Sequence, residues 1–581
     1  MSLSFRKNWH IWTLVAIMLV AFFVRSWQLE ETLYFKMDQA RDATIAMNAY
    51  NEGPGMLTLL GPRAAGSFLR LGPVFYYFQY LSSLLFGSVE PHVMVFPNLL
   101  FSLLTIPLLY YFLRQFFLRE TSVLISGLYS FSFLATQYSR FAWNPNQTPF
   151  WGLMFVLGLY KSATSENKKQ AGWWLLVAAV GYGVVSQLHF TSLLALPLVA
   201  GAFWLFFRPR GIKIYFWVVA LGVLSLFYAP MFISELATDW DNLNQFKYAL
   251  TAKSQEYPIL EKVEQSLRLH GQYHSLALTS YGNTKDSVFV WFFLFLVGFG
   301  FWRGSVLWKE GDRNKRAFLM LIGSLFTVFG LLYTKLAFTV LKPRFWLLIV
   351  IVAYVILAML FEWLCSPGKK KRGRVAVAVI VTFLLGANFF AVGFWYQMLA
   401  SQKEGDSTSY GRELVLKQKN LVGLKQMKQA TAQMVKVSGK TGRKICFYTE
   451  GDYRSPYEYI IEVYFPGVEY KRISFGKDTN ESCTFFSIEH GLVVTEVNLP
   501  RDHDHEFFAT SRDDFGKVTI WSIEKKTEEE ISRIEQQQQD DENEKVVAKK
   551  VESNDVAVEE RNDKPRRKER VFWKDIWNKE E

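Results

Sequence analysis

The sequence predicts a polytopic α-helical membrane protein with a small α/β or α+β domain near its C-terminus. Half of the 581 residues are hydrophobic and 17% are aromatic. The apolar residues are gathered into blocks of roughly 16–24 residues, the length that crosses a hydrocarbon layer about 30 Å thick. After residue 398 the composition becomes polar. A soluble chain of this length would instead divide its apolar residues among several compact cores.

The first apolar block, residues 9–25, follows Arg6 and Lys7 and therefore resembles a signal peptide. No small-residue cleavage site follows it, so we expect an uncleaved first span with a cytoplasmic N-terminus. The other blocks lie at 73–87, 92–113, 121–138, 148–161, 172–188, 190–207, 214–233, 287–302, 317–334, 345–364 and 375–397.

The block at 73–87 decides the topology. It is short, aromatic and studded with polar residues, so it could span the membrane or lie along the interface, where Tyr is favoured. If it does not cross, twenty basic residues fall in the inner segments and four in the short outer turns. The inner ones are Arg6, Lys7, Arg114, Arg119, Lys161, Lys168, Lys169, Arg208, Arg210, Lys213, Arg303, Lys309, Arg313, Lys315, Arg316, Lys369, Lys370, Lys371, Arg372 and Arg374. The positive-inside rule then predicts eleven spans in a plasma membrane, with the C-terminal domain outside.

The same rule accounts for most of the net charge of +12, so we expect no nucleic-acid partner. We divide the chain into a transmembrane domain (1–398), an outer-face domain (399–525) and a charged, largely disordered tail (526–581). The last stretch of the tail, Arg566 to Trp577, has the composition to touch a membrane surface or a partner.

The first outer loop, residues 26–91, carries the most informative acid, Asp38. Asp42 follows four residues later, so a helix would place both carboxylates on one face. An acid at the aqueous mouth of a helical bundle can act as a general base. The alternative interpretation is that these residues are ordinary loop charges or the N-terminal cap of a helix.

The outer turn at 139–147 combines Arg140 and two amides, Asn144 and Asn146, with aromatic residues. Rings cover the apolar faces of sugars and amides bond their hydroxyls, so this turn suits a sugar site. Two Asn around a Pro are also typical of a simple tight turn, which is the interpretation that the sequence alone favours.

Three further polar residues lie at outer ends of spans. His189 ends one span, where it is either functional or a satisfied structural histidine. Lys342 and Arg344 open another span on the outer side, against the charge rule. They favour an anionic partner such as a phosphate, or else a contact with lipid headgroups.

These segments together resemble the GT-C glycosyltransferases, specifically family 39 and its relatives, which include protein O-mannosyltransferases and lipid A aminoarabinose transferases. The resemblance covers about residues 1–400, and it depends on the order and spacing of its motifs, since none is specific alone. The residues that carry it are Asp38–Arg41, Arg70–Tyr77, Ser139–Arg140 with Asn144–Asn146, His189–Phe190 and Pro343–Phe345.

The resemblance implies an inverting enzyme that moves a sugar from a polyprenyl-phosphate donor to an acceptor hydroxyl on the outer face. Asp38 would be the general base, with Asp42 beside it, and Arg70 and Arg344 would hold the donor phosphate. The implied partners are membrane lipids, the lipid-linked sugar and an acceptor protein, lipid or glycan. The remaining substrate-binding candidates are Arg41, Tyr76, Tyr77, Arg140, Asn144, Asn146, His189 and Lys342.

The chain departs from the family pattern in two places. Gln39 stands where the family commonly has Glu, and Asn144 and Asn146 stand near a point where close relatives often carry Asp. Fewer carboxylates weaken a site for a divalent cation, so we expect metal-independent catalysis with no cofactor beyond the lipid-phosphate sugar. Residues 502–505, Asp-His-Asp-His, could ligate a metal or form a plain surface loop.

In the C-terminal region we expect a helix over 411–436 and strands at 444–449, 485–488, 491–494 and 518–521. Cys446 and Cys483 both lie here and could pair, whereas Cys365 ends a span.

Two other function classes remain open from the sequence. A transporter or lipid flippase would tend to show internal repeats and ionisable residues at mid-membrane, but we find no repeat and the charged candidates cluster at outer ends. A polyprenyl-linked glycan ligase or polymerase uses similar donors. A long loop late in the bundle would favour it, whereas here the long loops are 26–91 and 234–286.

Overall fold

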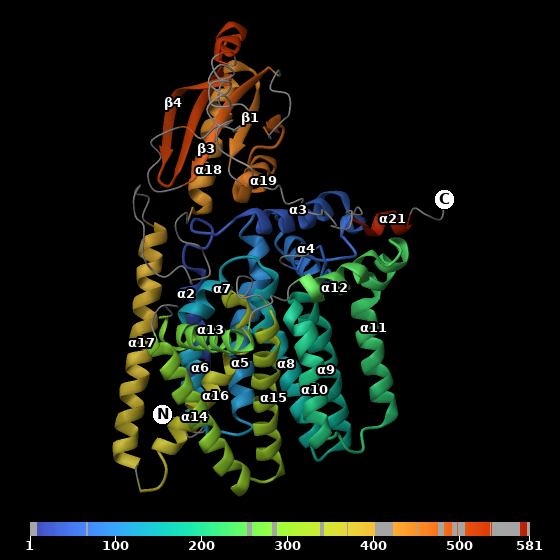
Figure 1. Ribbon diagram of the computed structural model, residues 1–581, viewed down its shortest axis with the longest axis vertical. Coiled ribbons are helices and arrows are strands. Elements are labelled where there is room, and N and C mark those ends of the chain that lie inside the picture. The colour runs from blue at the N-terminus through green and yellow to red at the C-terminus, as the bar shows by residue number, and fades with distance from the viewer. Residues whose placement is uncertain are drawn as a thin grey trace, which may run out of the picture.

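The computed structural model describes residues 8–64, 68–252, 258–281, 287–336, 342–368, 370–400, 422–449, 451–473, 482–490, 497, 506–534, 536 and 570–577. A bundle of helices carries a five-stranded C-terminal domain on one end, with a layer of short helices between them (Figure 1). The fold class expected from the sequence is therefore confirmed. Residues 491–494 and 502–505, for which we expected a strand and either a metal site or a loop, lie outside the described residues.

The bundle contains most of the apolar blocks as helices. They are α2 (Trp9–Ser26), α5 (Phe96–Leu113), α6 (Arg119–Ser130), α7 (Phe133–Ser139), α8 (Thr148–Thr164), α9 (Lys168–Leu188), α10 (Phe190–Phe206), α11 (Ile214–Ala237), α14 (Ser287–Glu310), α15 (Arg313–Lys335), α16 (Ile351–Leu364) and α17 (Lys370–Ala400). Within the described residues, seven segments are long and apolar enough to cross a membrane. The chain is therefore a multi-pass membrane protein, and the number of eleven spans stays a prediction.

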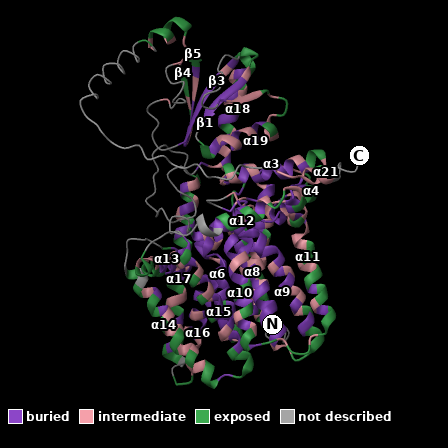
Figure 2. Ribbon diagram, turned by 45° about the vertical axis from the view of Figure 1, so that its right-hand side comes forward, coloured by how far each residue is buried: buried purple, intermediate pink, exposed green. Residues whose placement is uncertain are grey.

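The outer helices of the bundle have many exposed residues (Figure 2), and large apolar side chains are among them. In α11 and α14 the most apolar stretch is only 11% buried. Trp291, Phe295 and Phe301 of α14 are all more than half exposed. Large contiguous apolar surfaces are unfavourable in water, so these faces are suited to contact lipid chains.

Two predicted spans are not single helices. The block at 121–138 breaks between α6 and α7, where the Asn388 amide oxygen accepts a hydrogen bond from the Phe133 backbone at 2.8 Å. The block at 345–364 begins with the short helix η4 (Pro343–Phe345), and α16 starts only at Ile351. Polar groups freed at such breaks must find partners inside the protein because lipid offers none.

The expected outer loop at 234–286 is largely helical. It forms α12 (Asp241–Ala252) and α13 (Ile259–Thr279), and the second half of α13 is buried against the bundle. Trp346 donates to His270 at 3.0 Å and Tyr354 donates to the Ala277 carbonyl at 2.7 Å. Much of this segment is therefore part of the core rather than a free loop.

The first loop, residues 26–91, forms the layer between bundle and C-terminal domain. It contains α3 (Met37–Glu52), the short helix η1 (Pro54–Met56) and α4 (Val74–Phe86) (Figure 1). The block at 73–87 is thus a 13-residue helix, about 20 Å long, which is too short to cross the hydrocarbon layer. Leu85 and Phe86 at its end are exposed, as expected for a helix at the interface.

The two ends of the bundle differ in charge. The connections α10–α11, α14–α15 and α16–α17 all lie at the end away from the C-terminal domain (Figure 1). These connections include basic residues of the inner group, among them Arg208, Arg210, Arg313 and Lys315. The arrangement agrees with the loop assignment made from the charges.

The C-terminal domain comprises α18 (Leu424–Thr441), β1 (Lys444–Thr449), the short helix η6 (Gly451–Tyr453), α19 (Arg454–Tyr464), β2 (Tyr470–Arg472), β3 (Cys483–His490), β4 (Phe507–Phe515) and β5 (Val518–Lys525). The sheet order is β2-β1-β3-β5-β4, parallel across the first three strands and antiparallel across the last three. The strands expected at 444–449, 485–488 and 518–521 are all present.

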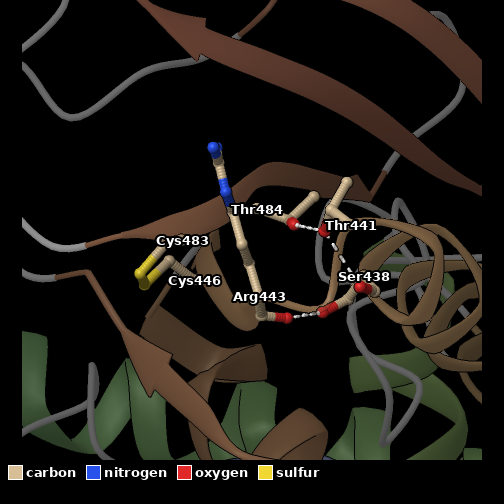
Figure 3. The surroundings of a disulfide bond; sticks show 6 residues. All are labelled: Ser438, Thr441, Arg443, Cys446, Cys483 and Thr484. Atoms are coloured by element: carbon tan, nitrogen blue, oxygen red, sulfur yellow. Dashed lines mark hydrogen bonds between the residues drawn. A yellow bond between two sulfur atoms is a disulfide. The ribbon is translucent and has the colours of Figure 1, made fainter.

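Cys446 on β1 and Cys483 on β3 form a disulfide, with their Cα atoms 5.6 Å apart (Figure 3). The pairing that the sequence left open follows from the sheet topology. β1 and β3 are parallel neighbours, and this register brings together two cysteines that are 37 residues apart in the chain. Close by, the hydroxyls of Thr441 and Thr484 are hydrogen-bonded at 2.7 Å.

The end of the chain returns to the first loop. Residues 570–577, with the short helix α21 (Trp573–Trp577), lie beside α3 and α4 (Figure 1). The Leu59 backbone donates to Val571 at 3.2 Å and the Trp573 backbone donates to Leu57 at 3.1 Å. In the described residues this stretch contacts the chain's own first loop, and the expected contact with a membrane or a partner stays a prediction.

Candidate active site

The site begins at the N-terminus of α3. The side-chain oxygen of Gln39 accepts a hydrogen bond from the Lys36 backbone at 3.2 Å, as in a capping box. Capping requires only an acceptor oxygen, so Gln39 performs this task as well as a glutamate would. The helix start places Asp38 in the first turn, where the helix dipole favours a carboxylate.

Asp38 and Asp42 lie on one face of α3, as predicted, and Arg41 bridges them. Arg41 Nη1 is 2.8 Å from Asp38 Oδ1, and Arg41 Nε donates to Asp42 Oδ1 at 2.7 Å. Tyr76 on α4 donates to the same Asp42 oxygen at 3.2 Å. The side chain of Asp38 is 41% exposed, whereas that of Asp42 is fully buried. The two acids are therefore not equivalent, since only Asp38 can meet a solute.

Burial raises the pKa of Asp42 from its ordinary value of 3.8 to about 6, although the neighbouring Arg41 acts in the opposite direction. Arg41 itself has a raised pKa, because the favourable charges of Asp42 and Asp38 outweigh its burial. At neutral pH, Arg41 is therefore a fixed cation between two carboxylates, and it holds one oxygen of Asp38 in place.

A pocket of about 130 Å³ opens beside Asp38. Its lining residues are Tyr34, Lys36, Met37, Asp38, Gln39, Phe141, Trp143 and Asp452. The pocket combines one exposed carboxylate of α3 with three aromatic rings, a composition suited to a sugar or another polyhydroxyl group.

Arg344 extends this site from η4. Its guanidinium lies 4.7 Å from the centre of the ring of Trp143, and Trp143 lines the pocket. Burial lowers the pKa of Arg344, and the nearby charge of Asp38 acts in the opposite direction. Among the described residues, no carboxylate forms an ion pair with Arg344, so this cation is available to an anion in or near the pocket.

Arg70 lies in a second cavity next to the first loop. Its backbone donates to the side chain of Asn242 on α12 at 2.8 Å, and that side chain donates back to the Arg70 carbonyl at 3.1 Å. Gly72, in the same motif, approaches α9 so closely that a Cβ atom there would lie 2.1 Å from Gln187 Oε1. The motif around Arg70 is thus fixed by α9 on one side and α12 on the other.

The structure does not bring Arg140, Asn144 or Asn146 into the Asp38 pocket. Arg140 is buried, and it donates to the Arg25 carbonyl at 2.7 Å and to Thr32 at 2.8 Å. Asn144 donates to the Leu188 carbonyl at 2.5 Å and Asn146 to the Phe141 carbonyl at 2.8 Å. These side chains position the turn that carries Phe141 and Trp143.

His189, Tyr77 and Lys342 also lie outside the lining of that pocket. His189 is buried, with Nδ1 2.7 Å from the Thr191 hydroxyl and its ring edge-on to Phe345 at 4.7 Å. Tyr77 accepts a hydrogen bond from Trp573 at 3.0 Å. Lys342 is exposed at the start of η4.

The sequence did not single out Lys36 or Asp452. Lys36 Nζ lies 3.6 Å from Asp452 Oδ2, and both line the Asp38 pocket. The position of Lys36 directly before Met37–Asp38 was a usable signal. Nothing in the sequence brings Asp452, which follows β1 in the C-terminal domain, to the first loop.

One group of side chains in the described part of the chain has spacing suited to a metal ion. Glu30, Glu90 and His92 place ligand atoms within 4.8 Å of one another. Glu30 is 3.1 Å from Lys428 Nζ, and Glu90 accepts from Tyr464 at 3.0 Å, so these acids join the first loop to the C-terminal domain. Asp38 is not in this group, and metal-independent catalysis stays a prediction.

Comparisons with known proteins agree with this architecture. Residues 71–233 match the family model of dolichyl-phosphate-mannose-protein mannosyltransferases. No curated protein matches the chain.

Several solved structures are similar over most of the chain. ArnT from Cupriavidus metallidurans in the apo state has a TM-score of 0.51 and 11% identity, covering 89% of this chain and 98% of that one. ArnT bound to undecaprenyl phosphate has a TM-score of 0.49 and 12% identity, with the same coverage. The Archaeoglobus fulgidus oligosaccharyltransferase has a TM-score of 0.45 and 12% identity, covering 82% of this chain and 68% of that one. The match to apo ArnT, with a TM-score above 0.5, shows that this chain has the fold of that protein over most of its length.

Proposed function

We propose that the protein is an inverting membrane glycosyltransferase. It moves a sugar from a polyprenyl-phosphate donor to an acceptor hydroxyl on the outer face of the plasma membrane. The observation that carries this proposal is the pairing of an exposed carboxylate, Asp38, with a cation free of carboxylate partners among the described residues, Arg344, around one aromatic pocket. The pocket lies at the end of a membrane bundle, where a lipid-linked donor and an aqueous acceptor can meet.

In this mechanism Asp38 is the general base. As the acceptor oxygen attacks the anomeric carbon, Asp38 takes the hydroxyl proton, and the bond between that carbon and the phosphate oxygen breaks. The bonding electrons leave with the phosphate, whose charge Arg344 neutralises. A single displacement of this kind inverts the configuration at the anomeric carbon.

The neighbouring residues support this role of Asp38. Arg41 holds Asp38 Oδ1, and within the described residues Oδ2 has no hydrogen-bond partner, so it remains available to accept a proton. Asp42 is buried and contacts Arg41 and Tyr76. We therefore assign Asp42 as a positioning residue that orients Asp38 through Arg41, rather than as a second base.

The outer location is supported by two features of the C-terminal domain. It lies at the end of the bundle opposite the basic connections, which the positive-inside rule assigns to the cytoplasm (Figure 1). It also contains the Cys446–Cys483 disulfide, a bond that persists in oxidising compartments outside the cytoplasm. Lys36 and Asp452 line the pocket from the two domains, so the acceptor would enter between them.

The test measures sugar release and transfer by the purified protein with a panel of polyprenyl-phosphate sugars. Asp38→Asn preserves the shape of the side chain but removes the base, so we expect a rate loss of about 10²–10⁴-fold. Glu264→Gln is the matched control, because Glu264 is an exposed carboxylate on α13 that pairs only with Arg268 among the described residues. Full activity of Asp38→Asn would overturn the base assignment, and absence of turnover with every donor would overturn the proposed function.

A further inference from the structure

The cavity beside Arg70 gathers three arginines from opposite ends of the chain. It has a volume of about 40 Å³, and Arg63, Arg70 and Arg570 all line it. Such a volume holds a few water molecules or the oxygens of one phosphate group. Asp241 is the one carboxylate among its described lining residues.

Arg63 and Arg70 are held opposite each other by the backbone. They form an antiparallel bridge, flanked by a hydrogen bond from Leu71 to Pro62 at 2.9 Å and one from Ala64 to Leu69 at 2.8 Å. Like charges directly opposite each other are unfavourable. In this protein a third cation, Arg570, lines the same cavity and increases its positive charge further.

The electrostatic environment of Arg70 shows the same excess of positive charge. Burial, together with the charges of Arg570 and Arg63, lowers the pKa of Arg70 to about 10. Among the described residues, no carboxylate forms an ion pair with Arg70 or Arg570. Cations gathered in a partly buried cavity are stabilised when an anion binds between them.

Two polar groups in the cavity also lack partners within the described residues. The Ser234 hydroxyl and the Gln245 side-chain oxygen are buried, with 1% and 3% residue exposure, and neither makes a hydrogen bond there. Buried polar groups are nearly always satisfied, so this pair points to a bound molecule. A hydroxyl donates to a phosphate oxygen, and an amide oxygen accepts from a sugar or water hydroxyl.

Arg570 is brought to the cavity by specific contacts of the segment 570–577. Phe572 pairs with Thr58 in an antiparallel bridge, and the Trp573 indole donates to the Tyr77 hydroxyl at 3.0 Å. The Asp575 carboxylate accepts from the Phe572 backbone at 2.8 Å and caps the start of α21. These contacts fix the register of the segment and therefore the position of Arg570.

We propose that residues 570–577 form a strap that completes a phosphate-binding pocket, in which Arg570 joins Arg63 and Arg70. The ligand is the phosphate group of a lipid at the outer face. That this lipid is the polyprenyl-phosphate sugar donor rests on the proposed function. The pocket itself is expected to bind the phosphate of a lipid headgroup by the same chemistry.

The test uses the full-length protein in phosphatidylcholine nanodiscs and measures binding of a short-chain fluorescent polyprenyl phosphate. Arg570→Gln removes the strap's cation, and a charged hydrogen bond of this kind corresponds to a loss of at least about tenfold in affinity. Arg570→Lys keeps the charge without the planar fork, so it should recover part of the affinity. Arg533→Gln is the control, because Arg533 is an exposed arginine outside the cavity.

Trp573→Ala tests the strap separately. It removes the hydrogen bond to Tyr77 that holds the segment, whereas the arginine at position 570 is unchanged. It should weaken binding with little change in the thermal unfolding of the bundle. Competition by phosphatidic acid would assign the pocket to headgroups in general, and competition by polyprenyl phosphate alone would assign it to the donor. Either result supports the shared chemistry.

Wild-type affinity in Arg570→Gln, or no binding by the wild type, would overturn this inference. The outcome is separable from that of the proposed function. Sugar transfer by the wild type with unchanged binding in Arg570→Gln refutes only the strap. Arg570-dependent binding without any sugar transfer refutes only the enzymatic function.

Discussion

Lys36 and Asp452 form an ion pair, with Nζ 3.6 Å from Oδ2, that joins the first loop to the C-terminal domain at the edge of the Asp38 pocket. The Lys36 ammonium also lies 4.8 Å from the centre of the Tyr453 ring. The C-terminal domain is thus one wall of the site.

Asp452→Asn should change acceptor binding more than stability. The side chain of Asp452 is 68% exposed, and exposed ion pairs contribute less than about 1 kcal/mol. We expect an acceptor KM raised several-fold, with the melting temperature and the hydrolysis of the lipid-linked sugar unchanged. Asp514→Asn, on β4 and away from the pocket, is the control. An unchanged KM for the acceptor would exclude the C-terminal domain from acceptor binding.

Asp42→Asn should alter the pH dependence of the reaction. At neutral pH the ionised Asp42 orients Arg41, and protonation near its pKa of about 6 weakens that pair. We expect kcat/KM to fall below about pH 6 in the wild type. In Asp42→Asn it should be lower by about tenfold or more at pH 7, with this acidic limb flattened. A limb that persists unchanged in the variant would assign the titration to another group.

The same residue gives stability a defined pH dependence. Because the folded-state pKa of Asp42 is raised above 3.8, its protonated form stabilises the fold below about pH 4, and this contribution is lost as the pH rises through about 6. Thermal unfolding of wild type and Asp42→Asn between pH 4 and 7 tests this, since the difference between the two should vary over that window and be constant above it.

Arg344→Gln should lower kcat by about 10²-fold or more, because it removes the cation that stabilises the leaving phosphate. Arg344→Lys keeps the charge but loses the stacking on Trp143, so its loss should be smaller. The measurement is kcat and KM for the lipid-linked sugar, determined separately. Equal activity of Arg344→Gln and wild type would remove Arg344 from the mechanism.

Cys446→Ser should destabilise the C-terminal domain by about 2–4 kcal/mol, since the disulfide closes a loop between residues 37 apart. Cys365→Ser, at the end of α16, is the control because Cys365 is a free thiol. Thermal unfolding with and without reductant is the measurement. If the reductant lowers the stability of the wild type no more than that of Cys446→Ser, the bond does not form in the protein.

Several features could be predicted from local sequence. The apolar blocks predicted helices, and the charge pattern predicted that 73–87 would not cross, which agrees with the short helix α4. The spacing of Asp38 and Asp42 predicted a shared helix face, and α3 provides it. Such features depend on residues within a few turns of one another, where periodicity and charge are sufficient.

Other features depended on contacts between distant segments. We expected the amides and aromatic rings of the turn at 139–147 to bind a sugar. Asn144 and Asn146 instead donate to backbone carbonyls, whereas Trp143 lines the pocket. The segment 234–286 was expected to be an outer loop, yet the second half of α13 is buried in the core, where His270 accepts from Trp346 and the Ala277 carbonyl accepts from Tyr354.

The sequence by itself predicted a multi-pass membrane protein that resembles the GT-C glycosyltransferases, with Asp38 in the first loop. Apolar length, charge distribution and motif order are properties of the chain alone. Tertiary structure decided that Asp42 is buried, that Asp452 lines the same pocket as Asp38 and that Arg570 lines the same cavity as Arg70. The physical reason is that these pairings depend on which distant segments of the chain pack together. Burial and proximity, rather than residue type, therefore decide which role each of these side chains has.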